Sequence, residues 1–222
     1  MKFLKDQFAS SPVWARIMPL FIFLVLTSAQ GWFGEPGRYW VYFGKTLIGA
    51  WLVWLMRPYV AEMRWAFSWE AVGVGIVVCA IWVGLDPFYP KMGTAGEPWN
   101  PNVTFGESAL LAWFFVAVRI LGSSLVVPPL EEVFYRSFVY RYVAKPGFES
   151  VPLNHFSWTP LLITSGIFGL VHHEWLAGIL CGLLYQWLVI RTNRLGDAMT
   201  AHAITNFLLG LWVVFRPDWH FW

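Results

Sequence analysis

Long apolar stretches without a single charged residue recur along this chain of 222 residues. The first extends over residues 17–34, and another covers residues 71–85. A helix that crosses a bilayer needs about 20 mostly apolar residues. Inside lipid every backbone polar group must be bonded within the protein, which favours helices. The sequence therefore predicts an all-α, polytopic membrane bundle.

Composition supports the same conclusion. Hydrophobic residues make up 58% of the chain and charged residues 13%, which leaves too little polar surface to solvate a globule of this size. The 16 tryptophans suit the two interfaces of a bilayer, where Trp is enriched. With a net charge of +2 and no long basic run, nucleic acid is not an expected partner. Cys79 and Cys181 lie in apolar stretches and predict neither a disulfide nor a zinc site.

About eight helices are expected, which together form one integral membrane domain over residues 1–222. Pro128-Pro129 is expected to end the fourth helix and start a fresh one, because proline cannot continue a regular helix. The apolar run 17–29 resembles a signal peptide with a cleavage site at Thr27-Ser28-Ala29; we favour an uncleaved first span. The expected helices cover residues 17–34, 39–56, 69–85, 108–130, 131–143, 158–172, 175–190 and 198–215.

The distribution of charges predicts the orientation of the first half of the chain. Basic residues before the first span and after the second favour a cytoplasmic N-terminus and second loop, whereas the long loop 86–107 carries three acids. With eight full crossings, Arg191 and Arg194 would lie outside, against the positive-inside rule. The short helix 131–143 would then not cross fully, and the topology of the second half stays open.

Ionisable side chains interrupt the apolar helices in the second half. A charge at the bilayer centre costs about 2.5 to 3.5 kcal/mol on insertion scales, so such residues are candidates for function. Three of the expected helices supply them, and the residues concerned are Glu131, Glu132, Arg136, His172, His173, His202 and Asn206.

The spacing of these residues indicates their roles. Glu132 and Arg136 are four positions apart with the acid first, the favourable order for an ion pair on a helix. Glu131 points in another direction and stays unpaired, as a general base requires. His202 and Asn206 are also four apart and can present donors to one point, as an oxyanion site needs. Spacing alone does not choose between His172 and His173.

Three ordered motifs in this region resemble those of a known family. Glu131-Glu132-Val-Phe-Tyr-Arg136, Phe168-Gly-Leu-Val-His172 and His202-Ala-Ile-Thr-Asn206 are similar to the EExxxR, FxxxH and HxxxN motifs of the CPBP (Abi) intramembrane glutamic endopeptidases, the family of the Ras-converting CAAX prenyl endopeptidase. The resemblance covers about residues 108–215. It implies a helical bundle with a polar intramembrane cavity and a peptidase that needs no obligatory metal.

The resemblance also implies a role for each motif residue. Glu131 and His172 would activate the attacking water, and His202 and Asn206 would stabilise the oxyanion. Supporting roles fall to Glu132 and Arg136, which would brace the helix, and to Phe168, which would shape the cavity wall. The expected substrate is a membrane-associated protein or peptide, lipidated or not, and the expected location is a bacterial cytoplasmic membrane.

Two other functional hypotheses use the same residues. The Glu and His side chains could hold a divalent metal in a metalloprotease, although no HExxH helix is present. Alternatively, the chain could be a non-catalytic membrane binding or immunity protein, or a transporter with a proton relay.

Other residues favour structural interpretations or leave alternatives open. Gly178 and Gly182 form a small-xxx-small pair, which predicts a packing face between helices. Arg119, within an apolar stretch, could snorkel, pair with an acid or line the cavity, and the sequence does not choose among these.

Overall fold

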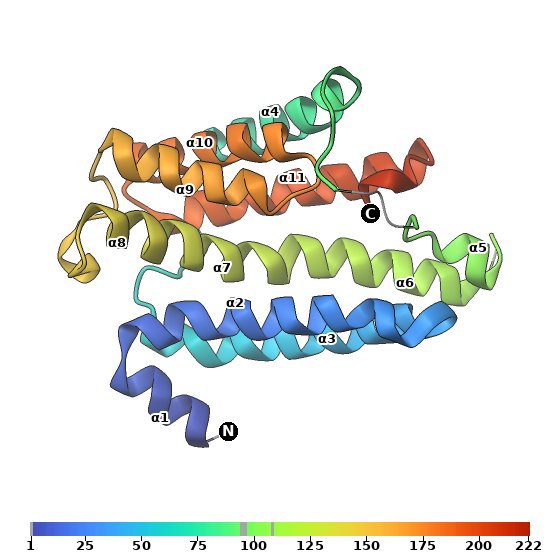
Figure 1. The fold of residues 1–222 in the computed structure, drawn as a ribbon, viewed down its shortest axis with the longest axis horizontal. Coiled ribbons are helices and arrows are strands. Elements are labelled where there is room, and N and C mark those ends of the chain that lie inside the picture. The colour runs from blue at the N-terminus through green and yellow to red at the C-terminus, as the bar shows by residue number, and fades with distance from the viewer. Residues whose placement is uncertain (1, 94–96, 108) are drawn as a thin grey trace.

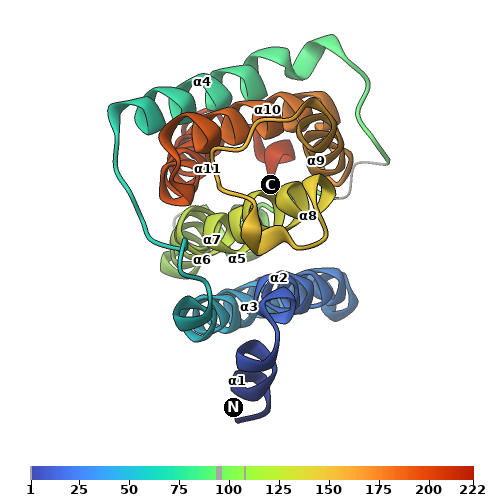
Figure 2. The same ribbon diagram turned by 90° about the vertical axis from the view of Figure 1, so that its left-hand side faces the viewer.

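The helices of this protein lie in layers, with one long helix in the middle (Figures 1 and 2). The computed structural model describes residues 2–93, 97–107 and 109–222, and this part of the chain contains no β-strand. Five helical stretches within it are long and apolar enough to cross a membrane: Pro12–Tyr59, Trp69–Phe88, Leu110–Ala144, Trp175–Thr192 and Leu195–Phe215. The predicted all-α membrane bundle is confirmed.

The N-terminal layer is a helical hairpin. Helix α1 (Lys2–Ser10) precedes α2 (Pro12–Ala29), which packs along α3 (Gly34–Met56). A short turn, η1 (Gln30–Phe33), joins the two long helices. Several large apolar side chains of this hairpin remain exposed, among them Phe21, Leu24 and Trp54, as expected for surfaces that contact lipid rather than water.

The C-terminal helices form the opposite layers. Helices α9 (Trp158–Leu170) and α11 (Leu195–Phe215) lie next to the central helix, α10 (Trp175–Thr192) packs against both of them, and α4 (Trp69–Leu85) covers α10 and α11 from outside (Figure 2). Close packing of α9 on α10 depends on glycine. A Cβ atom on Gly178 would lie 2.8 Å from Cα of Gly169, and one on Gly182 would lie 2.8 Å from Cα of Ser165. The predicted packing face is therefore present.

The central helix runs without interruption over Leu110–Ala144 (Figure 1). It consists of α6 (Leu110–Leu121), the π-helical segment η4 (Gly122–Val126), α7 (Val127–Glu132), the π-helical segment η5 (Val133–Val139) and α8 (Tyr140–Ala144). The expected break at Pro128-Pro129, with a separate short helix after it, is therefore wrong. Proline clashes with the carbonyl four residues back in an α-helix, and the wider π turn before it moves that carbonyl away.

The fused central helix changes the topology. The described chain now makes seven passes along the bundle, through α2, α3, α4, the central helix, α9, α10 and α11. The N-terminal segment and the loops 57–68, 145–157 and 193–194 meet at one end, which we call the basic end. Most of the Lys and Arg residues that lie in loops or near helix ends are at the basic end. Arg191 and Arg194 lie at this end, as do Arg57 and Arg64. The positive-inside rule predicts that this end faces the cytoplasm.

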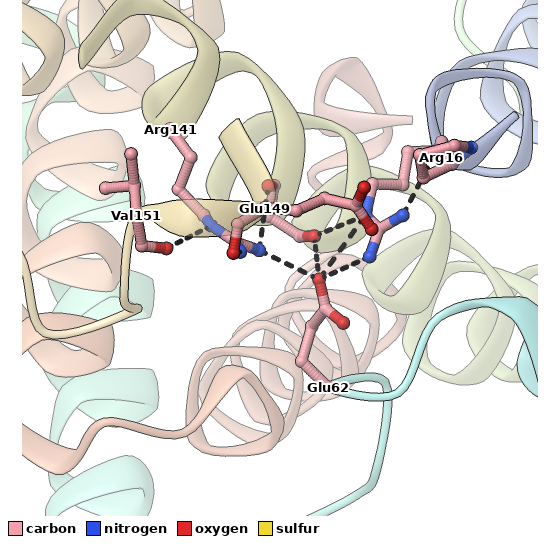
Figure 3. A network of polar contacts seen from close by, with 7 residues as sticks. Arg16, Glu62, Arg141, Glu149 and Val151 are labelled. Carbon is pink, nitrogen blue, oxygen red and sulfur yellow. Dashed lines mark hydrogen bonds and ion pairs between the residues drawn. The ribbon is translucent and has the colours of Figure 1, made fainter. Parts of the chain in front are cut away.

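A network of polar contacts joins the elements at the basic end (Figure 3). The Glu62 carboxylate lies 2.8 Å from a terminal nitrogen of Arg16 and 3.0 Å from one of Arg141, and it also accepts a hydrogen bond from Ser137. Arg141 in turn donates to the Val151 carbonyl over 2.8 Å. These contacts join α2, the loop 57–68, the central helix and the loop 145–157.

Candidate active site

The centre of the site is a buried carboxylate that joins two helices. Glu132, at the end of α7, is fully buried, and its Oε2 lies 3.1 Å from Nε of Arg136. Its Oε1 lies 2.9 Å from Nδ1 of His202 on α11. The ion pair expected from the four-residue spacing therefore forms, and it also orients a histidine from another helix.

The adjacent acid, Glu131, has different surroundings. It forms no ion pair with any described residue, and its Oε2 is buried without a hydrogen-bond partner. A buried carboxylate oxygen without a partner is costly, so this position suits a bound water or substrate group. Glu131 lines a cavity, as do several of the other motif residues described below.

His172 follows α9 and presents one ring nitrogen for chemistry. Its Nδ1 lies 2.6 Å from the carbonyl oxygen of Phe168. Because a carbonyl only accepts hydrogen bonds, this contact assigns the proton of the neutral ring to Nδ1 and leaves a lone pair on Nε2. The rings of Trp82 and Phe168 hold the imidazole, at centroid distances of 5.6 and 4.8 Å. His173 instead contacts the carbonyl of Met92.

Phe168, which was expected to shape the cavity wall, packs against Arg136, His172 and His202 and is not among the residues that line the cavity. Its ring is buried and lies 5.0 Å from Tyr135 and 6.3 Å from His202, measured between centroids. The Arg136 guanidinium lies over its face, 4.5 Å from the centroid. This cation–π contact gives the buried arginine a second favourable partner besides Glu132.

Asn206 on α11 contacts the π-helical segment of the central helix. Its Nδ2 donates to the Ser123 carbonyl over 2.8 Å. In a π turn this carbonyl would be paired with the residue five positions later, which is Pro128 and has no N–H. Asn206 therefore satisfies a carbonyl that proline leaves without a donor. One hydrogen of its amide is used in this way, and the second remains available.

The four predicted catalytic residues line one cavity of about 610 Å³: Glu131, His172, His202 and Asn206. Its wall also includes Gln30, Glu97 and Trp99, which belong to the turn after α2 and the loop after α4. These segments lie at the end of the bundle opposite to the basic end, and we call it the acidic end. The cavity thus extends from the motif residues toward the acidic end.

Sequence reasoning missed several residues of this cavity. Tyr185 donates to Thr205 over 2.7 Å, and its ring lies 5.3 Å from that of His202. Trp82 packs against His172. Both come from apolar helices in which nothing but a bulky aromatic residue distinguishes them, so no sequence signal could have selected them. Arg119 also lines the cavity. Of the three alternatives that the sequence left open for it, the structure therefore supports the third, a place in the cavity wall.

The acids and histidines of the site do not form a metal cluster. Within residues 2–93, 97–107 and 109–222, no group of three or more His, Cys, Asp or Glu side chains is arranged to hold a metal ion. Both cysteines are free thiols.

Comparison with known proteins finds a similarity to one described family over part of the chain. Residues 112–208 match a family model described as Rce1-like, type II CAAX prenyl endopeptidase. No curated protein and no solved structure matches the chain. The matched region begins in α6 and ends in α11, and it contains all three motifs.

Proposed function

Through residues 112–208 the chain belongs to the Rce1-like family of type II CAAX prenyl endopeptidases, and from this premise we propose that it is a glutamate-type peptidase of the membrane. The family implies a peptidase that acts on membrane-associated substrates. The observation that carries the glutamate mechanism is the pair of unpaired groups in one cavity: the Glu131 carboxylate and Nε2 of His172.

Glu131 and His172 would activate a water molecule. A water bound between the Glu131 carboxylate and Nε2 of His172 would transfer one proton to the carboxylate as its oxygen attacks the carbonyl carbon of the substrate. The carbonyl π bond opens to a tetrahedral oxyanion. Glu131 would then return the proton to the amide nitrogen as the C–N bond breaks, so that the acid ends the cycle as it began.

His202 and Asn206 would stabilise the oxyanion. Glu132 lies against Nδ1 of His202, so a positive charge on that ring would be balanced while Nε2 donates to the oxyanion. The second hydrogen of the Asn206 amide would provide another donor. Preorganised donors of this kind contribute about 3 kcal/mol each to the stabilisation of a transition state.

The proposed substrate is a protein or peptide held at the membrane, with or without a lipid anchor, and the proposed location is a bacterial cytoplasmic membrane. We propose that no metal takes part. A metalloprotease with the same Glu and His residues makes a different prediction: its activity would vanish with a strong chelator and return with zinc.

The decisive experiment compares membranes that contain the wild-type protein with membranes that contain Glu131→Gln. Mass spectrometry of peptide termini should find new termini only with the wild type, because the amide cannot accept the proton of the water. Glu70→Gln is a matched control, since Glu70 pairs with Arg191 on the surface and lies outside the cavity. Equal amounts of the same termini with Glu131→Gln would refute the mechanism, and no new termini with either protein would refute the peptidase itself.

A further inference from the structure

Two cations in the cavity wall have no anionic partner among the residues that the structure describes. Lys45 on α3 is only 6% exposed, and its ammonium makes one hydrogen bond, to Thr27 Oγ1 over 3.0 Å. Arg119 on α6 lines the same cavity. Neither lies within ion-pair distance of a described carboxylate, although the cavity wall also contains Glu97, Glu131 and Glu174.

The two cations share one aromatic ring. The Lys45 ammonium lies 4.6 Å from the centroid of the Tyr42 ring, and the Arg119 guanidinium lies 5.0 Å from the same centroid. Arg119 also contacts Trp99 and Trp222, at 4.8 and 5.4 Å. Two like charges so close together repel each other in a low dielectric, and cation–π contacts compensate only part of that cost. The arrangement is therefore incomplete without an anion.

Another cation of the same cavity has a partner. Arg38 forms an ion pair with Glu35 and donates to the Pro98 carbonyl over 2.7 Å. Arg38, beside the loop 97–107, thus pairs with an acid. In the described part of the chain no acid pairs with Lys45 or Arg119, which lie in the cavity wall farther along α3 and α6.

The cation pair lies between the acidic end and the motif residues. Arg119 precedes Ser123 by one helical turn, and the Ser123 carbonyl accepts the hydrogen bond from Asn206. At about 1.5 Å per residue, Arg119 is about 6 Å from the level of Ser123 and about 18 Å from that of Glu131. An extended peptide rises about 3.4 Å per residue, so these distances correspond to about two to five residues.

We infer that Lys45 and Arg119 form a subsite that binds an oxyanion of the substrate, with Tyr42, Trp99 and Trp222 as its aromatic walls. This inference rests on the proposed function, because it assigns the anion to the molecule that is cleaved. A carboxylate at the end of an apolar peptide fits the chemistry. A lipid phosphate group offers the same chemistry from another source.

The test measures binding and cleavage separately. The probe is a pool of apolar N-acetylated octapeptides, prepared once with a free C-terminal carboxylate and once with a C-terminal amide. Binding is measured by thermophoresis to the Glu131→Gln protein in nanodiscs of zwitterionic lipid, and again in nanodiscs with anionic lipid. Cleavage is measured by mass spectrometry with otherwise wild-type protein. Both measurements are repeated in the background of Lys45→Met, Arg119→Met and the two together.

The acid pool should bind about tenfold to a hundredfold more tightly than the amide pool, as expected for hydrogen bonds to a charged group. The double variant should lose this difference, Arg119→Lys should retain most of it, and Arg57→Gln, at the basic end, should leave it unchanged. Lys45→Met should not lower the melting temperature, because it removes a buried charge that has no counter-ion. If Lys45 served only to stabilise the fold, Lys45→Met would lower the melting temperature.

Several results would overturn the inference. Equal binding of the acid and amide pools to the parent protein would refute a carboxylate subsite, and so would a preference that survives in the double variant. If both peptide pools bound more weakly, and to the same extent, in nanodiscs with anionic lipid than in zwitterionic nanodiscs, the subsite would be assigned to lipid phosphate instead. Because binding is measured on a variant without cleavage activity, a failure of the proposed peptidase leaves this measurement intact.

Discussion

At the scale of single residues, two adjacent acids of the central helix have opposite surroundings. Glu132 contacts Arg136 and His202, whereas Glu131 has a buried oxygen without a partner. Successive helical positions differ by about 100° in direction, so one acid faces α11 and the other faces the cavity. Glu132 thus holds neighbouring side chains in place, whereas the Glu131 carboxylate remains free to bind a group in the cavity.

A third acid, Glu62, lies outside the apolar helices and holds the basic end together. Burial by itself would raise the pKa of the Glu62 carboxyl, but the Arg16 guanidinium and the hydrogen bond from Ser137 hold this pKa below its usual value. The carboxylate form is therefore favoured in the folded protein, and its stabilising effect is present above the pKa of the unfolded chain, about 4.3.

Glu62→Gln should lower the free energy of unfolding at pH 7 by about 3 kcal/mol, because two buried arginines lose their partner. As the pH falls through the lowered pKa of Glu62, the wild type should lose the same stabilisation, so the difference between the two proteins should shrink below about pH 4. Thermal unfolding in detergent at several pH values measures this difference. A constant difference down to pH 3 would contradict the assignment.

At the scale of elements, the central helix depends on two π-helical segments and on its contact with α11. The widened turn at Gly122–Val126 lets the helix pass through Pro128-Pro129, and Asn206 pairs with the carbonyl that results. The interface of α9 with α10 depends on a different device, the absence of side chains at Gly169, Gly178 and Gly182. Both devices set the distance between the helices that hold the motif residues.

Gly182→Val should destabilise the protein by about 1 to 3 kcal/mol, since its side chain would overlap the backbone of Ser165 and force α9 away from α10. Cleavage should fall as well, because α9 places His172. The control is Gly166→Ala on α9, where an added Cβ meets nothing within 4 Å; alanine there should leave stability equal or slightly higher. Unchanged stability of Gly182→Val would show that the helices can separate at no cost.

At the scale of the whole molecule, the two ends differ in charge and in their position relative to the motif residues. The Glu62 network joins the elements of the basic end (Figure 3), where a separate pocket is lined by Glu62 and Arg141, whereas the cavity that holds the motif residues extends toward the acidic end. If the positive-inside rule holds, the proposed active site opens on the side of the membrane away from the cytoplasm. Its substrates would then reach it from that side.

Cysteine labelling tests this orientation. In a background with Cys79→Ala and Cys181→Ala, Phe88→Cys at the acidic end should react with a membrane-impermeant maleimide in intact cells. Lys145→Cys at the basic end should react only after the membrane is opened. Both original side chains are exposed, so accessibility to water is not limiting. The reverse pattern would invert the topology, and labelling of both from one side would refute the seven passes.

The sequence by itself determined the all-α membrane class and the bounds of some helices. Residues 69–85 were expected as one helix and form α4 with the same bounds, because the charge-free stretch 71–85 belongs in the bilayer, where a helix satisfies its own backbone polar groups. The pairing of Glu132 with Arg136 could also be predicted, since both residues lie on one helix face. The three motifs all lie within residues 112–208, which match the Rce1-like family model.

Only the tertiary structure decided the remaining features. Pro128-Pro129 does not break the central helix. The Ser123 carbonyl, which proline leaves without a donor, accepts a hydrogen bond from Asn206 instead, 83 residues farther along the chain. Arg119 proved to line the cavity together with Lys45 because α3 and α6 pack side by side. Local periodicity shows which way a residue faces on its own helix, whereas its partners come from other helices, and these are set by packing.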